Sequence, residues 1–135
     1  MTLRHTLFPA NARSFPGQRG ANVILRTLHL AGIAGIGAAY LYAPVTSGWW
    51  PYFYLALISG SGLAAIYLWS NGIWLVQLRG QVILLKLLFL VLIPFLPDLR
   101  AGLFLAVIVL SGWIAHAPGD VRYYSLWHRR RVERI

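Results

Sequence analysis

Four long apolar runs, separated by short polar breaks, dominate the pattern of this chain. They cover about residues 24–43, 51–70, 80–97 and 100–117. An α-helix rises about 1.5 Å per residue, so about 20 residues cross a hydrocarbon core of about 30 Å. The runs approach this length once the aromatic residues at their ends are included. We therefore expect an all-α fold, an integral membrane four-helix bundle with up-down connectivity.

Turn-forming residues mark the breaks and divide the chain into three parts. Residues 1–22 form a basic arm, residues 23–117 a four-span transmembrane domain, and residues 118–135 a basic tail that we expect at the membrane interface. Without these aromatic residues each run is slightly short for a full crossing, and the third and fourth are the shortest. A chain with three crossings and one hairpin that enters the membrane without crossing it therefore stays open as an alternative.

Arginine is distributed unequally among the connections. If the N-terminus lies inside, the outer side receives only Arg100. The inner side receives Arg4, Arg13, Arg19, Arg26, Arg79, Arg122, Arg129, Arg130, Arg131 and Arg134. Because Lys and Arg gather in cytoplasmic loops, we expect both termini in the cytoplasm and an even number of crossings, which favours four over three. The expected location is a bacterial-type inner membrane.

The composition supports this interpretation and excludes several kinds of site. Charged residues make up 11% of the chain and hydrophobic residues 59%, whereas about 25% of a soluble domain is charged. The absence of cysteine excludes disulfides, thiolate metal sites and cysteine nucleophiles. The net charge of +9 lies beside the apolar runs, where it meets anionic lipid head groups. We therefore expect lipid partners and no nucleic acid.

Basic and aromatic side chains are expected at the lipid interface. They are Arg26, Arg79, Lys86, Arg122, Trp127, Arg129, Arg130 and Arg131. Lys86 starts about 9 Å inside the third run. Its long side chain can reach back to the interface, which we favour over a functional lysine inside the membrane because a buried charge is costly.

Small residues form stripes at helical spacing in the first two runs. Ala31, Gly35 and Ala39 recur every four residues, and Gly60 and Gly62 lie in the second run. Such stripes let two helix backbones approach closely in lipid. We expect them to pack the first two spans together. A docking face for another protein, or room for a flat ligand, is the alternative.

Two histidines give the one candidate cofactor site. His29 and His116 lie near the inner ends of the first and fourth runs, with Gly32 and Gly35 close to His29. Two facing imidazoles could ligate the iron of haem b, and the glycines could leave space for the macrocycle. Hydrated or carbonyl-bonded histidines are the simpler interpretation, so no cofactor is firmly predicted. Quinone binding near the same pair is a further possibility, and no metal site is expected.

Catalytic residue patterns are missing from the sequence. It has no HExxH motif, no paired carboxylates and no Ser-His-acid set. We therefore expect a non-catalytic membrane protein, an accessory subunit or assembly factor of a larger complex with a membrane protein partner or a second copy. A bis-histidine haem b or quinone-linked electron-transfer subunit is the first alternative. An oligomeric transporter or channel, with a path that includes Ser59, Ser61, Asn71 and Gln81, is the second.

Overall fold

Long helices account for most of the fold. The computed structural model describes residues 7–9, 11–42 and 47–133. Its long helices are α2 (Gln18–Tyr42), α3 (Trp50–Ser70), α4 (Leu78–Leu92) and α5 (Arg100–His116). Four stretches are long and apolar enough to cross a membrane: Gln18–Tyr42, Trp50–Ser70, Leu78–Phe95 and Pro97–His116. The all-α expectation is confirmed, and the helices have the length and composition of transmembrane spans.

Short elements fill the connections. They are the 3₁₀ turns η1 (Ser47–Trp49), η2 (Gly72–Leu75), η3 (Ile93–Phe95) and η4 (Pro97–Leu99), the short helix α6 (Gly119–Arg122), and the strands β1 (Tyr124–Ser125) and β2 (Arg130–Arg131). Pro94 lies in η3, just after α4 ends at Leu92. Proline lacks a backbone N–H and cannot continue the hydrogen-bonding pattern of an α-helix, which explains why α4 stops there.

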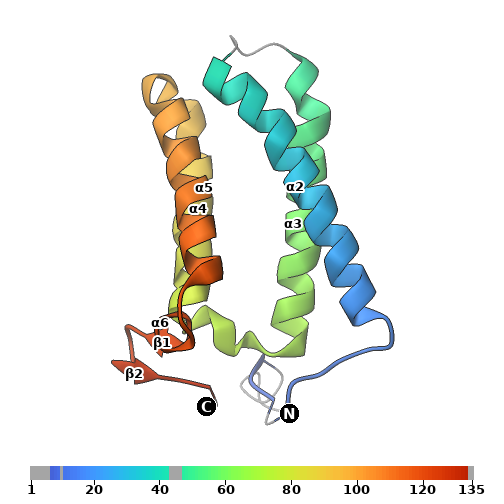
Figure 1. The fold of residues 1–135 in the computed structure, drawn as a ribbon, viewed down its shortest axis with the longest axis vertical. Helices are drawn as coiled ribbons and strands as arrows, with labels where there is room; N and C mark the ends of the chain where they lie inside the picture. The colour runs from blue at the N-terminus through green and yellow to red at the C-terminus, as the bar shows by residue number, and fades with distance from the viewer. Residues whose placement is uncertain (1–6, 10, 43–46, 134–135) are drawn as a thin grey trace. The chain divides into compact units, whose positions relative to one another are not determined.

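The chain divides into two compact units, each built around one helical hairpin. Residues 12–70 form the α2–α3 unit, and residues 71–133 with the described part of residues 1–11 form the α4–α5 unit. In each unit the two long helices run side by side (Figure 1). Each pair is antiparallel, as a short connection between consecutive helices requires.

Close backbone contact holds α2 against α3. A Cβ added at Gly32 would lie 2.6 Å from the backbone nitrogen of Ala56 and 2.8 Å from the carbonyl oxygen of Tyr52. A Cβ at Gly35 would collide with the ring of Tyr52. Only glycine permits this approach.

The predicted small-residue stripe matches the packed side of α2 at two of its three residues. Gly32, Gly35 and Ala39 lie on the side of α2 that is packed, whereas Ala31, which the four-residue spacing included, is exposed. A step of one residue turns the side-chain direction by about 100°, so Ala31 and Gly32 cannot both face α3.

The α4–α5 hairpin has its own apolar core. Val82, Ile114 and Ala117 are buried together, and Leu78 and Leu110 pack against them. Most of the other large side chains of α4 are exposed, including Leu84, Leu87 and Val91, as expected for a helix with a lipid-facing surface.

The C-terminal tail folds back onto the end of this hairpin. β1 and β2 pair antiparallel, with Tyr124 opposite Arg131, and the turn between them places Arg129 at a φ of 49°. The buried Gln77 side chain donates a hydrogen bond of 2.6 Å to the Val132 carbonyl. The sequence predicted an interfacial segment here and gave no indication of the two strands.

The boundaries of the N-terminal part also differ from the expected ones. α2 begins at Gln18, inside the stretch expected to be an arm. A turn precedes it, in which the amide N–H of Gln18 donates to the carbonyl of Phe15 and Gly17 has a φ of 82°. Pro16 and Gly17 occupy the positions that a type II turn requires. Arg4 and Arg134 lie outside the described residues.

Candidate functional site

The two candidate haem ligands, His29 and His116, each form a hydrogen bond to a backbone carbonyl within their own unit. Nδ1 of His29 lies 2.8 Å from the carbonyl oxygen of Ala56 on α3. Nδ1 of His116 lies 2.8 Å from the carbonyl oxygen of Gly112, one turn earlier on α5. A carbonyl oxygen only accepts, so a neutral imidazole in this position carries its proton on Nδ1. Nε2 then keeps its lone pair.

The room near His29 is used for helix packing. Its ring lies over Gly60, where an added Cβ would be 2.9 Å from the imidazole. The space beside Gly32 and Gly35 holds Tyr52 and Ala56. In the structure these glycines therefore allow α3 to pack closely against α2, and they leave no gap between α2 and α3 for a macrocycle.

Lys86 has a partner that the sequence did not reveal. Its ammonium nitrogen donates to the Ser111 hydroxyl of α5 at 3.0 Å, and Ser111 donates in turn to the Val107 carbonyl at 2.7 Å. This hydrogen bond gives one of the three ammonium donors of Lys86 an acceptor on the facing helix, so that donor needs no reach to the interface.

Three of the four polar residues considered for a transport path form local hydrogen bonds, and the fourth, Ser61, is exposed. Ser59 is buried and donates to the Leu55 carbonyl of its own helix. Asn71 accepts from the Ile73 amide and caps η2, and Gln81 donates to the Val76 carbonyl. These bonds fix the ends and faces of helices.

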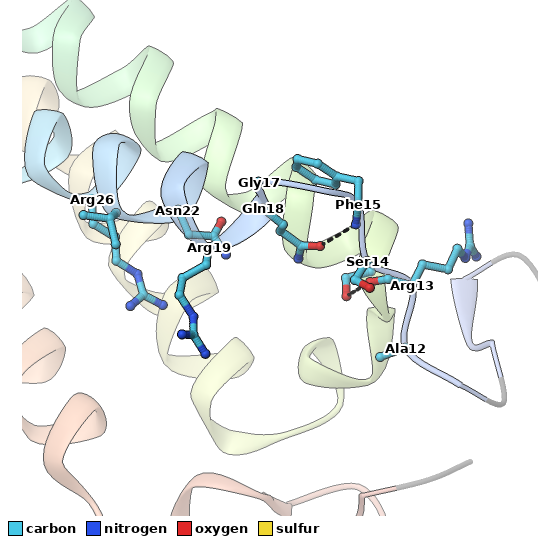
Figure 2. Close-up of a pocket in the computed structure, with 11 residues that line it drawn as sticks. Ala12, Arg13, Ser14, Phe15, Gly17, Gln18, Arg19, Asn22 and Arg26 are labelled. Atoms are coloured by element: carbon cyan, nitrogen blue, oxygen red, sulfur yellow. Dashed lines mark hydrogen bonds between the residues drawn. The ribbon is translucent and has the colours of Figure 1, made fainter.

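An arginine-lined hollow lies at the polar end of the α2–α3 hairpin (Figure 2). Its walls come from the arm and the first turns of α2 and include Arg13, Gln18, Arg19, Asn22 and Arg26. Arg26 donates to the Tyr67 hydroxyl and lies over its ring. Every residue that lines the hollow belongs to the unit of residues 12–70.

The arm beside the hollow is fixed to the end of α3. The amide of Arg13 donates to the Ser70 carbonyl at 2.9 Å, and the Ser70 hydroxyl donates to the Arg13 carbonyl at 2.6 Å. The rings of Phe15 and Trp69 meet edge to face at 5.8 Å. These contacts hold the turn before α2 in place, and that turn sets the position of the arginines that follow it.

A second basic cluster surrounds Tyr123 in the α4–α5 unit. The guanidinium carbons of Arg79, Arg122 and Arg131 lie 5.2–5.4 Å from the centre of its ring. Arg131 also pairs with Glu133 and Asp120. Hydrogen bonding to Glu133 is the main cause of a raised pKa of the Arg131 guanidinium. The charge of Glu133 and the hydrogen bond and charge of Asp120 add to it, and desolvation opposes it.

The remaining predicted interface residues lie on the outside of the tail. Arg129 and Arg130 are exposed, and Trp127 is 87% exposed. A tryptophan this exposed next to arginines suits contact with lipid head groups.

The sequence and structure were compared with protein-family models, curated proteins and solved structures. None of them matches this chain. Among the described residues, no three His, Cys, Asp or Glu side chains lie close enough together to hold a metal ion.

Proposed function

We propose that this chain is an integral membrane protein of non-catalytic type that works as an accessory subunit or assembly factor of a larger membrane complex. Its four apolar helices would cross a bacterial inner membrane as an up-down bundle. Both termini would lie in the cytoplasm, where the arginines of the arm and tail meet anionic lipid.

The use of polar side chains within the spans is the observation that carries this proposal. His29, Ser59, Lys86 and Ser111 all hydrogen-bond inside their own hairpin. The small residues of α2 likewise serve contact with α3. Groups used in this way shape two stable hairpins, and the outward faces, which carry large apolar side chains, are left to meet lipid and partner helices.

Site-directed photocrosslinking tests whether a partner protein contacts the exposed face of α3. The exposed α3 positions Leu57, Ile58, Ser61, Ala65 and Leu68 would each be replaced in turn by p-benzoylphenylalanine and irradiated in cells. A partner helix should give one adduct protein at positions three or four apart, because these share a helix face. The same protein should co-purify with the unmodified chain in mild detergent.

Loss of both signals would contradict the proposal. A chain that purifies alone as a monomer, with only lipid adducts at every scanned position, has no stable protein partner. Adducts with many proteins and no helical period would indicate random collision and would count equally against it.

A haem b subunit is the second candidate function, and the histidine geometry favours it. In both histidines the carbonyl bond at Nδ1 leaves Nε2 as the basic nitrogen, which is the arrangement common in metal-ligating imidazoles. A visible spectrum of protein purified from haem-sufficient cells decides the question. A Soret band that is lost in His29→Ala and His116→Ala would support haem, and a colourless preparation would exclude it.

A further inference from the structure

We propose that the hollow at the polar end of the α2–α3 hairpin binds the phosphate of an anionic head group, with Arg19 and Arg26 as the two binding cations. This site goes beyond the accessory role proposed above, and it rests on the part of that proposal in which α2 crosses the membrane. The ligand chemistry is a phosphate ester that carries a hydrogen-bond donor. A glycerophospholipid such as phosphatidylglycerol has this chemistry.

Helix geometry brings the two arginines together. Arg19 and Arg26 are seven residues apart on α2, which places them two turns apart on one face. Figure 2 shows both side chains extending to the same side of the helix. Arg13 also lines the hollow, but its side chain points away from the other two in this view, and its guanidinium lies 5.8 Å from the Trp69 ring.

The charge of the site is not balanced by acids of its own unit. The chain's three acidic residues are Asp98, Asp120 and Glu133, so residues 12–70 contain none. Arg26 uses one of its donors on the Tyr67 hydroxyl, and a guanidinium has five N–H donors. Guanidinium groups bind phosphate oxygens with paired hydrogen bonds, so an anion is the expected occupant.

An unsatisfied acceptor lies between the two arginines. Asn22 is three residues after Arg19 and four before Arg26, on the same face. Its Oδ1 is buried and has no hydrogen-bond partner among the described residues. A buried acceptor without a donor is costly. Water does not reach this oxygen in the structure, so a hydroxyl of the bound head group would satisfy it once the Asn22 side chain turns toward the hollow, while the arginines hold the phosphate.

The hollow also has apolar side chains, and these favour a lipid over a soluble anion as the molecule that carries the phosphate. Phe15 and Val23 line it as well and are 38% and 58% exposed. Val23 leads into the apolar part of α2, where acyl chains would lie with the helix across a bilayer. A soluble phosphate would gain nothing from these surfaces.

Native mass spectrometry of the full chain in a neutral detergent tests the site. Phosphatidylglycerol would be titrated into the wild type and into Arg19→Gln/Arg26→Gln. The variant should bind the first lipid about tenfold more weakly, because hydrogen bonds to charged groups are lost. Arg129→Gln/Arg130→Gln removes the same charge from the exposed tail, where the arginines meet head groups without a hollow around them, so its loss of affinity should be clearly smaller than that of Arg19→Gln/Arg26→Gln. Circular dichroism checks that each variant stays folded.

Two further measurements refine the test. The first separates the effect of arginine geometry from that of charge, and the second separates binding of a lipid from binding of a free anion. Arg19→Lys/Arg26→Lys keeps the charge but loses the planar fork, so its affinity should fall between wild type and the glutamine variant. Inorganic phosphate at millimolar concentration should not displace the lipid. Displacement would assign the phosphate site to a soluble anion. Equal losses in the hollow and tail variants, or no loss in either, would overturn the proposal.

Discussion

At the scale of single residues, the contact partner of each glycine decides its role. Gly32 meets backbone atoms of α3, and an added Cβ would have no flexible side chain to push aside. Gly102 and Gly112 on α5 have no atom within 4 Å of the same hypothetical Cβ. The sequence presents all three as small residues in apolar runs, and only the packing tells them apart.

Gly32→Ala should therefore destabilise the α2–α3 hairpin, by about 1–3 kcal/mol, because the methyl group forces two backbones apart. Gly102→Ala is the matched control. It should be neutral or stabilising by up to about 1 kcal/mol, since alanine favours helix and nothing obstructs it. The measurement is the free energy of unfolding in mixed micelles titrated with dodecyl sulfate. Equal effects of the two substitutions would show that this helix contact does not form.

At the scale of elements, helices with long apolar runs were predictable and short elements were not. The four spans follow from length and hydrophobicity alone. The start of α2 does not, because it depends on the turn formed by Pro16 and Gly17. Residues 1–22 were expected to be an arm, so Arg19 was not placed on the same helix as Arg26 and their shared face was not predicted. The strands β1 and β2 are two residues long each, too short for a periodic signal.

The tail hairpin gives a prediction at this scale. Gln77→Leu removes the hydrogen bond to the Val132 carbonyl and leaves that carbonyl buried without a donor, a loss of about 1–3 kcal/mol. The tail should then open more often, and trypsin should cut after Arg129, Arg130 and Arg131 about tenfold faster or more.

Gln81→Leu controls for the loss of a glutamine from α4. Gln81 bonds to Val76, with no described hydrogen bond to the tail, so its cleavage rate should stay near that of the wild type. If Gln77→Leu is cut no faster than the unmodified chain, the Gln77–Val132 bond does not hold the tail.

At the scale of the whole molecule, the account depends on four helices that cross a bilayer. Their lengths and compositions allow this, and the arginine pattern predicts that both termini lie on one side. The hydrogen bonds of His29 and His116 lie within separate hairpins. The distance between the two histidines is therefore set by the association of the hairpins. Sequence cannot predict that, since it depends on how two separately packed hairpins associate.

Cysteine accessibility in intact cells tests the central claim most directly. The chain has no cysteine of its own, so single cysteines can be placed in the arm, the first connection, the third connection and the tail, at Ser14, Gly48, Asp98 and His128. With a membrane-impermeant maleimide, Gly48→Cys and Asp98→Cys should be labelled in spheroplasts, and Ser14→Cys and His128→Cys only after the membrane is opened. Labelling of Ser14→Cys and His128→Cys from opposite sides, or of all four positions without permeabilisation, would contradict the account.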